Sequence, residues 1–404
     1  MALTFPTIPK TLLSTLAIGI VCAVPMRALS AEDEASSITE AFEKGDASIS
    51  FRLRYEDVDQ EGTEPASATT LKTRITYTTA AYHGWALTTE MDDTTELFDA
   101  DYTDGVTGRG TAAIADPEVT EVNQAFISYT TGATTAKWGR QRILLDNQRF
   151  VGGVGWRQDE QTYSGFTLSS KPVDGLSLFY GYITEVNRIF AEAGDHNHDT
   201  HLINVKYGTT FGSIIGYGYM IDNRTALALG SDTMGLRWEG KIGKTFSYNL
   251  EYATQSEGGD NPNDYEADYM LAEVMGAIPI GSNKLKLKLG HEVLGSDDGT
   301  QGFTTSLATL HKFQGWADKF LGTPANGVAD TYASIGSNIG NVTLGLEYHS
   351  LASDFDDIDY GTEIDFIAKT KVGPLGLLLK YSDYSADDFA TDTQKIWLMT
   401  SVTF

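Results

Sequence analysis

The chain is short of cysteine and of long apolar runs, and each shortage excludes a class of protein. Its only cysteine among 404 residues is Cys22, which lies in an apolar stretch near the N-terminus. One thiol cannot build a disulfide framework or a cysteine-based metal site. Beyond that stretch, no run approaches the roughly 18 apolar residues that a membrane-spanning helix needs. The sequence therefore excludes a disulfide-stabilised domain and a helical membrane protein.

Basic residues are also scarce, which argues against nucleic acid as a partner. The chain has 29 Lys and Arg against 55 Asp and Glu, and its formal net charge at pH 7 is −26. A protein of this charge repels phosphate backbones at long range. We expect no nucleic acid among its partners.

The first 31 residues have the composition of a secretory signal peptide. Lys10 supplies the positive charge, and residues 11–24 are apolar but too short to span a bilayer. Small residues offer cleavage after Ser30 or Ala31. The alternative is a lipoprotein signal built on Cys22, but the small residue expected before such a cysteine is missing. We expect a signal peptide that is removed.

Alternating segments of about ten residues fill most of the chain, which is the pattern of β-strands. In the first segment Ile49, Phe51 and Leu53 fall on one face, and Arg52 and Arg54 fall on the other. The links alternate between short and long, as in barrels with short periplasmic turns and long external loops. We predict an all-β fold, a transmembrane antiparallel β-barrel of about 18 strands.

The two ends of the chain fit this prediction. The last segment keeps the alternation and stops at Phe404, like the aromatic end by which bacterial outer-membrane barrels are recognised for assembly. Before the first strand, Ser37 and Glu40 resemble a capping box, which predicts a short helix; the alternative is an unstructured leader. We expect a signal peptide at 1–31, a short periplasmic segment at 32–46 and the barrel at 47–404.

The inward parity of the strands carries more basic than acidic side chains, although acids dominate the chain. A row such as Lys284, Lys286 and Lys288 cannot face lipid, where each charge costs roughly 2–4 kcal/mol at mid-depth. Basic rings in a pore select anions. The alternative is that opposite charges neutralise each other across strands. The candidates on the wall are Arg52, Arg54, Lys72, Arg74, Arg237 and Lys286.

The long link at 143–161 adds four candidates. It carries Arg149 and Arg157, and Arg140 and Arg142 precede it. Guanidinium groups bind carboxylates with two parallel hydrogen bonds. The glycines of this link would let it fold inward as a constriction; the alternative is a surface loop with scattered ion pairs.

The longest link, 295–330, has apolar residues at approximately helical spacing. Leu307, Leu310, Phe313 and Phe320 show this pattern. It predicts a short helix or a plug-like insert.

Other polar clusters give weaker evidence of a functional site. Histidines at 196, 198 and 201 and aspartates at 354–359 lie in predicted external loops, without supporting groups or the twelve-residue calcium spacing. We predict no metal and no cofactor. A hydrolase needs a nucleophile beside a positioned base. Only His349 is predicted to face the lumen near an acid, Glu347, so we do not expect an enzyme.

Three segments resemble the alginate-export type of outer-membrane porin. They are SFRLRYEDVDQ at 50–60, GRQRILLDNQRFVGGVGWRQDEQT at 139–162 and LATLHKFQGWADKFLGTP at 307–324. The resemblance implies an 18-stranded barrel whose arginine-rich lumen passes anionic polyuronate. The second segment is typical of a wider group, which includes uptake porins for small solutes.

These observations predict an integral protein of the bacterial outer membrane, in contact with lipid and lipopolysaccharide. We expect passive passage of small or oligomeric hydrophilic solutes, with anionic, uronate-like saccharides foremost. The alternatives are a general non-specific diffusion porin and an outer-membrane barrel hydrolase.

Overall fold

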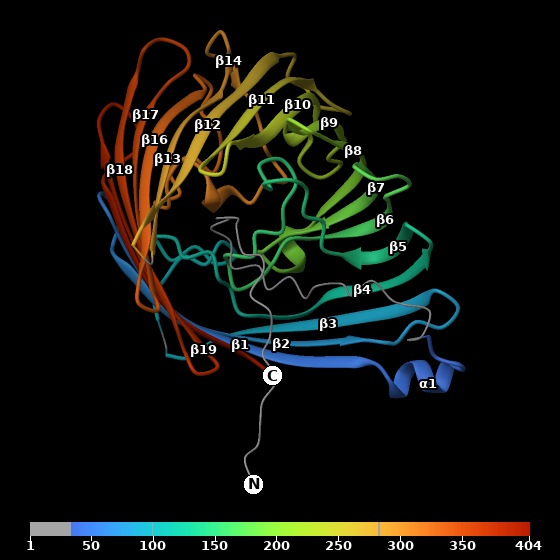
Figure 1. The fold of residues 1–404 in the computed structure, drawn as a ribbon. Helices are drawn as coiled ribbons and strands as arrows, with labels where there is room; N and C mark the ends of the chain where they lie inside the picture. The colour runs from blue at the N-terminus through green and yellow to red at the C-terminus, as the bar shows by residue number, and fades with distance from the viewer. Residues whose placement is uncertain (1–33, 99, 282) are drawn as a thin grey trace.

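The computed structural model describes residues 34–98, 100–281 and 283–404. The predicted signal peptide lies outside the described residues. Within them, one sheet of 18 antiparallel strands closes on itself, because the last strand pairs with the first (Figure 1). This closure confirms the predicted fold class.

The strands of the barrel follow one another in chain order around the ring. Their bounds are β1 (Asp46–Gln60), β2 (Ala66–Thr78), β3 (Trp85–Glu96), β4 (Val119–Thr131), β5 (Thr134–Gln141), β6 (Thr162–Ser170), β7 (Leu176–Asn187), β8 (His196–Thr209), β9 (Gly212–Ile221), β10 (Ser231–Ile242), β11 (Phe246–Glu257), β12 (Glu266–Ile280), β13 (Asn283–Leu294), β16 (Val328–Ile339), β17 (Val342–Ala352), β18 (Asp359–Val372), β19 (Leu375–Ala386) and β20 (Thr393–Thr403).

Smaller elements lie outside the wall. A helix, α1 (Ile38–Glu43), precedes β1, and the hairpin of β14 (Ser296–Asp297) and β15 (Gln301–Gly302) belongs to the longest loop. The remaining elements are the 3-10 turns η1 (Glu192–Gly194), η2 (Leu227–Leu229) and η3 (Leu310–Lys312). No helix in the described part of the chain is long and apolar enough to cross a membrane.

Links at the two ends of the barrel differ in length, as predicted. At one end, which we call the short-turn end, strands join through links such as 132–133, 210–211 and 373–374. At the other end, the long-loop end, the links 97–118 and 295–327 are many times longer. Of the two alternatives for the longest link, a short helix or a plug-like insert, the α-helix is wrong, because η3 is the only helical element among its described residues. Gln314 and Asp318 adopt positive φ angles (51° and 63°), which an α-helix cannot contain.

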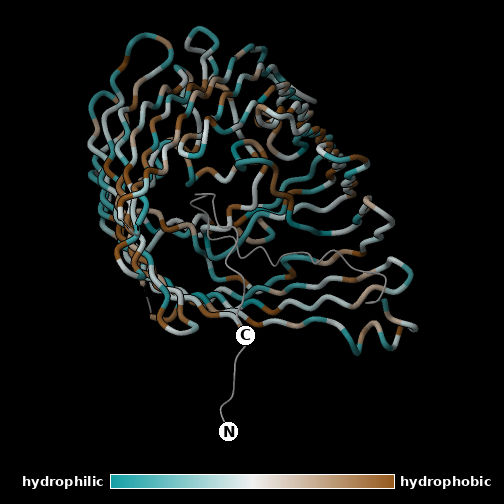
Figure 2. Tube along the Cα trace, viewed as in Figure 1, coloured by the Kyte–Doolittle hydropathy of each residue, from teal (hydrophilic) through white to brown (hydrophobic). Residues whose placement is uncertain are grey.

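The two faces of the wall have opposite character, because side chains alternate along each strand. Arg54 and Glu56 on the inner face of β1 are fully buried. On the outer face, Ile75 is 54% exposed and Trp138 is 71% exposed. Figure 2 shows hydrophobic and hydrophilic positions alternating along the strands. A wall with an apolar exterior and a charged interior suits lipid outside and water inside.

We predict that the short-turn end faces the periplasm. In intact cells, a membrane-impermeant maleimide should label Asp260→Cys in the long-loop end and leave Asp174→Cys in a short turn unlabelled. Both positions are exposed in the isolated protein, so both should react after the cells are lysed. Labelling of position 174 in intact cells would invert the orientation.

Candidate functional site

The lumen is crossed by the link between β5 and β6, residues 142–161, which lies inside the ring of strands (Figure 1). There it pairs with the longest loop through a short bridge between Val151 and Leu307. The backbone N–H of Gly152 donates to the carbonyl of Leu307 at 2.8 Å. A Cβ at Gly152 would lie 2.2 Å from the hydroxyl of Thr309, so only glycine permits this approach. The link therefore folds inward and meets the longest loop inside the ring of strands.

One end of this link is tied to the wall at β1 and β2. Arg52 donates through Nε to Gln158 at 2.8 Å and through Nη1 to the carbonyl of Gly155 at 2.9 Å. Arg54 donates to the carbonyl of Trp156, and Gln158 donates to the hydroxyl of Thr70 at 2.9 Å. Two of the predicted wall cations thus hold the constricting loop.

A third loop, 97–118, joins this contact through Asp116. Its carboxylate lies 3.0 Å from Arg54 Nη1 and accepts the backbone N–H of Gln158 at 2.7 Å. Asp116 and Arg54 are both fully buried. Asp116 is not among the residues that the sequence predicts for this site, because nothing in the sequence distinguishes it from the solvent-exposed acids of the long loops.

The other end of the link is tied to β13. Arg149 Nε lies 2.9 Å from Glu292 of β13, and Arg149 also donates to Gln314 of the longest loop at 3.1 Å. Its guanidinium carbon lies 4.6 Å from the centre of the Phe313 ring. Arg149 is 1% exposed, so its charge is compensated by Glu292 inside the protein.

Arg157 joins the two loops to the wall through Asp318. Its guanidinium lies 2.9 Å from Glu56 of β1 and 3.1 Å from Asp318 of the longest loop. Asp318 also lies 2.9 Å from Lys395 of β20. Burial raises the pKa of Asp318, but the nearby His311, Lys395 and Arg157 outweigh it and hold the pKa well below its usual range. Asp318 is therefore a stable anion at the centre of this group.

Glu160 gathers the remaining cations near β2 and β3. It lies 3.0 Å from Arg74 and pairs with Arg142, while Lys72 pairs with Asp92 at 2.8 Å. Burial by itself would raise the pKa of Glu160. The positive charges of Arg74, Arg142 and Lys72 have the larger effect and hold this pKa well below its ordinary value.

A β-bulge adds two amide donors to this group. Asn123 is the extra residue of β4 opposite Glu90 and Met91. As a result both Asn123 and Gln124 donate to Glu90, at 2.7 and 3.0 Å. Bulges redirect side chains in this way.

The longest loop contributes a neutral imidazole, that of His311, which contacts β19. His311 Nδ1 lies 2.7 Å from Asp318, and Lys380 Nζ lies 2.7 Å from His311 Nε2. Because Lys380 can only donate, Nε2 must accept and Nδ1 must carry the proton. Burial lowers the pKa of His311 to about 3. The ring stacks on Trp156 of the neighbouring loop, with centroids 4.7 Å apart.

The remaining three candidates lie apart from this centre. Arg140 shares the outer face of β5 with Trp138 and pairs across the sheet with Ala125, so it points away from the lumen. Arg237 lies on the inner wall 3.4 Å from both Glu239 and Glu251. Lys286 lies on the inner face of β13, towards the short-turn end.

Lys286 differs from the other inward candidates, because its ammonium group has no hydrogen-bond or carboxylate partner among the described residues. Lys284 on β13 and Lys369 on β18 also have none there, and both are close enough for their charges to act on Lys286. We call these residues the free lysines. The strands between them present small inward residues, Gly336 and Gly345, in register with Lys286. Alternation placed all three lysines inward, but only the structure separates them from the paired cations.

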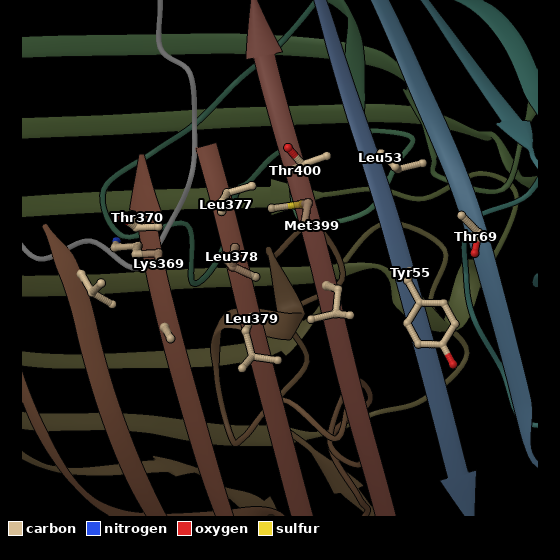
Figure 3. Close-up of a pocket in the computed structure, with 13 residues that line it drawn as sticks. Leu53, Tyr55, Thr69, Lys369, Thr370, Leu377, Leu378, Leu379, Met399 and Thr400 are labelled. Carbon is tan, nitrogen blue, oxygen red and sulfur yellow. The ribbon is translucent and has the colours of Figure 1, made fainter. Parts of the chain in front are cut away.

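One depression in the described surface lies outside the lumen. It spans β18, β19, β20, β1 and β2 and is lined by outward residues such as Leu53, Tyr55, Leu377 and Leu379 (Figure 3). Its position on the apolar exterior makes it part of the lipid-facing surface.

We predict that Asp318→Asn releases the longest loop. The substitution leaves Arg157 and Lys395 buried with less compensation, and breaking a buried ion pair costs about 3–5 kcal/mol. Single-channel conductance and current noise in planar bilayers should rise. Asp298→Asn, an exposed acid with positive φ in the same loop, should behave like the parent. Unchanged conductance in a folded Asp318→Asn barrel would show that this group does not hold the loop.

The fold matches solved outer-membrane channels over nearly its whole length. OccK11 (OpdR) of Pseudomonas aeruginosa is 15% identical, with a TM-score of 0.67 over 90% of this chain and 97% of that one. OpdK of the same organism, solved with vanillate, is 14% identical, with a TM-score of 0.68 over 89% and 98%. OccAB1 of Acinetobacter baumannii is 13% identical, with a TM-score of 0.66 over 93% and 100%. At these identities the likeness shows the fold.

Sequence comparison supplies the family. No curated protein sequence matches the chain. The model of the Alginate export family matches residues 46–272, which is more than half of the chain. That match runs from β1 into β12 and includes the constricting link with Arg149 and Arg157. The chain therefore belongs to the Alginate export family, and its fold is that of an outer-membrane porin.

Proposed function

We propose that this channel passes anionic hydrophilic solutes, with uronate-like saccharides as the favoured class. The observation that carries the proposal is the set of free lysines, Lys284, Lys286 and Lys369, in a lumen where most arginines pair with carboxylates. A cation that lacks a partner in the protein keeps its charge available to a passing solute. Basic groups that line a water-filled pore favour anions.

The distribution of charge along the channel supports this proposal. The long loops are rich in acids, and those acids repel anions at the outer rim. At physiological ionic strength this repulsion is screened within about 8 Å. Selection then depends on groups that a solute meets at closer range, and on the inner face of β13 and β18 these are the free lysines.

The chemistry of a uronate fits such a wall. Its carboxylate interacts with ammonium groups, and its hydroxyls suit amide and hydroxyl side chains of the wall. Resemblance to alginate-export porins points to the same class. One fold relative, OpdK, was solved with vanillate, which also carries a carboxylate.

A general diffusion porin is the second candidate, because any wet barrel wall carries charge. A barrel hydrolase receives less support. The polar neighbours that the structure gives His349 are the carboxylates of Asp330, at 2.9 Å, Glu347 and Asp365. The ring of Tyr332 also lies beside His349, but its hydroxyl donates to Glu273.

Removing two free lysines should reduce anion preference. A single charge acts through water with about 0.5 kcal/mol at about 8 Å. The double variant Lys286→Gln, Lys369→Gln should therefore lose about 1 kcal/mol, which is about five-fold in the anion-to-cation permeability ratio at low salt. Reversal potentials across a salt gradient measure this ratio. The matched control, Lys171→Gln, Lys244→Gln, removes two exposed lysines from short turns and should leave the ratio nearly unchanged.

Block by uronate oligomers tests the substrate class. Oligomers added to a planar bilayer should reduce the current, and the half-blocking concentration should rise in the Lys286→Gln, Lys369→Gln variant. Neutral oligosaccharides of the same length should block less. Cation preference in the parent protein, with no effect of uronates, would refute the polyuronate proposal and leave a general porin.

A further inference from the structure

The N-terminal helix α1 is fixed to the rim of the barrel at the short-turn end. The backbone N–H of Ala80 donates to the carbonyl of Ala41 at 2.9 Å, and that of Ala35 donates to the carbonyl of Ala81 at 2.8 Å. Ser37 caps the helix by accepting the N–H of Glu40 at 3.1 Å. Figure 1 shows α1 beside the end of β1, outside the ring of strands. The helix therefore has a defined orientation on the rim.

One face of α1 exposes two large apolar side chains. Ile38 is 64% exposed and Phe42 is 51% exposed. They are four residues apart, so they lie above one another on the same face of the helix. Both side chains keep more than half of their surface exposed in the described part of the chain. On the side of the helix that faces the barrel, the small side chain of Ala41 is buried against the rim.

Tyr77 connects this face to the outer wall of the barrel. It lies on the outward parity of β2 with Ile75, and its ring stacks on Phe42 with centroids 6.4 Å apart. Its hydroxyl donates to the carbonyl of Phe42. A Cβ at Gly45 would lie 2.3 Å from that hydroxyl, so this position must be glycine for the ring to pack there. Phe42 thus continues the lipid-facing surface beyond the end of the strand.

Aromatic side chains mark the same level around the barrel. Trp85 packs on Tyr129 with centroids 4.8 Å apart, and Trp238 packs on Tyr248 at 5.2 Å. Trp85 begins β3 directly after the turn that binds α1, and Trp238 lies near the short-turn end of β10. Aromatic residues form such girdles where a barrel wall meets the membrane–water interface.

We propose that α1 is an interfacial helix whose Ile38 and Phe42 insert into the phospholipid leaflet at the short-turn end of the barrel. The lipid-facing surface continues without interruption from Ile75 through Tyr77 to Phe42. The acidic residue Glu43 lies on another stripe of the helix and stays in water. Helices with this arrangement lie in the plane of the interface with their apolar face among the acyl chains.

Fluorescence quenching by lipids tests the proposal on the full-length barrel. In a Cys22→Ala background, Phe42→Cys and the control Glu43→Cys are each labelled with the same environment-sensitive fluorophore. The proteins are reconstituted in phosphatidylethanolamine–phosphatidylglycerol vesicles, with or without lipids that carry a nitroxide near the headgroup. Heat-modifiable migration checks that each labelled barrel is folded. Ile38→Cys serves as a second test position.

We expect the probes at positions 38 and 42 to emit at shorter wavelength, to be quenched several-fold more by nitroxide lipid than the probe at 43, and to resist aqueous iodide. Equal lipid quenching at 42 and 43, or full iodide access at 38 and 42, would overturn the proposal. Protection from iodide without lipid quenching would also overturn it and would indicate a second copy of the chain on this face.

Discussion

The absence of water from the bilayer core is the constraint on which the rest of this structure depends. Each backbone N–H and C=O there needs a partner within the protein, and a sheet meets this need only by closing. Pairing of β20 with β1 supplies that closure. An 18-stranded ring is too wide for wall side chains to fill. The loops that enter the lumen are the consequence of this width.

The loops inside the lumen determine what most of the charged side chains of the wall bind. The loop backbones need partners away from bulk water, and Arg52 and Arg54 supply them by donating to loop carbonyls. The charge of Arg54 is balanced in turn by the loop carboxylate of Asp116. Most inward arginines are thus structural, whereas Lys284, Lys286 and Lys369 have no carboxylate partner among the described residues.

Much of the wall follows from sequence alone, because a period of two fixes the face of every residue for as long as a strand continues. Arg52, Lys72 and Lys286 lie inward for this reason. The rule ends where the strand ends: Arg140 and Arg142 share a parity, yet Arg140 points outward and Arg142 points inward, because β5 stops at Gln141 and the chain turns into the lumen. Partners of the loops, such as Asp318 for Arg157, depend on three-dimensional closure and leave no local signal. The apolar spacing from Leu307 onward was compatible with a helix or a plug-like insert, and the positive φ angles of Gln314 and Asp318, which prevent a continuous helix, leave no local signal that reveals them in advance.

Asp318 connects the two strands at which the barrel closes. It binds Lys395 of β20, and through Arg157 it reaches Glu56 of β1. This arrangement is an internal clasp across the seam of the barrel. The complete clasp needs the first and last strands side by side, because its carboxylates and cations come from both of them and from the two loops. Separation of the two strands would therefore also break contacts of the longest loop, so the loop that enters the lumen adds to the stability of the seam.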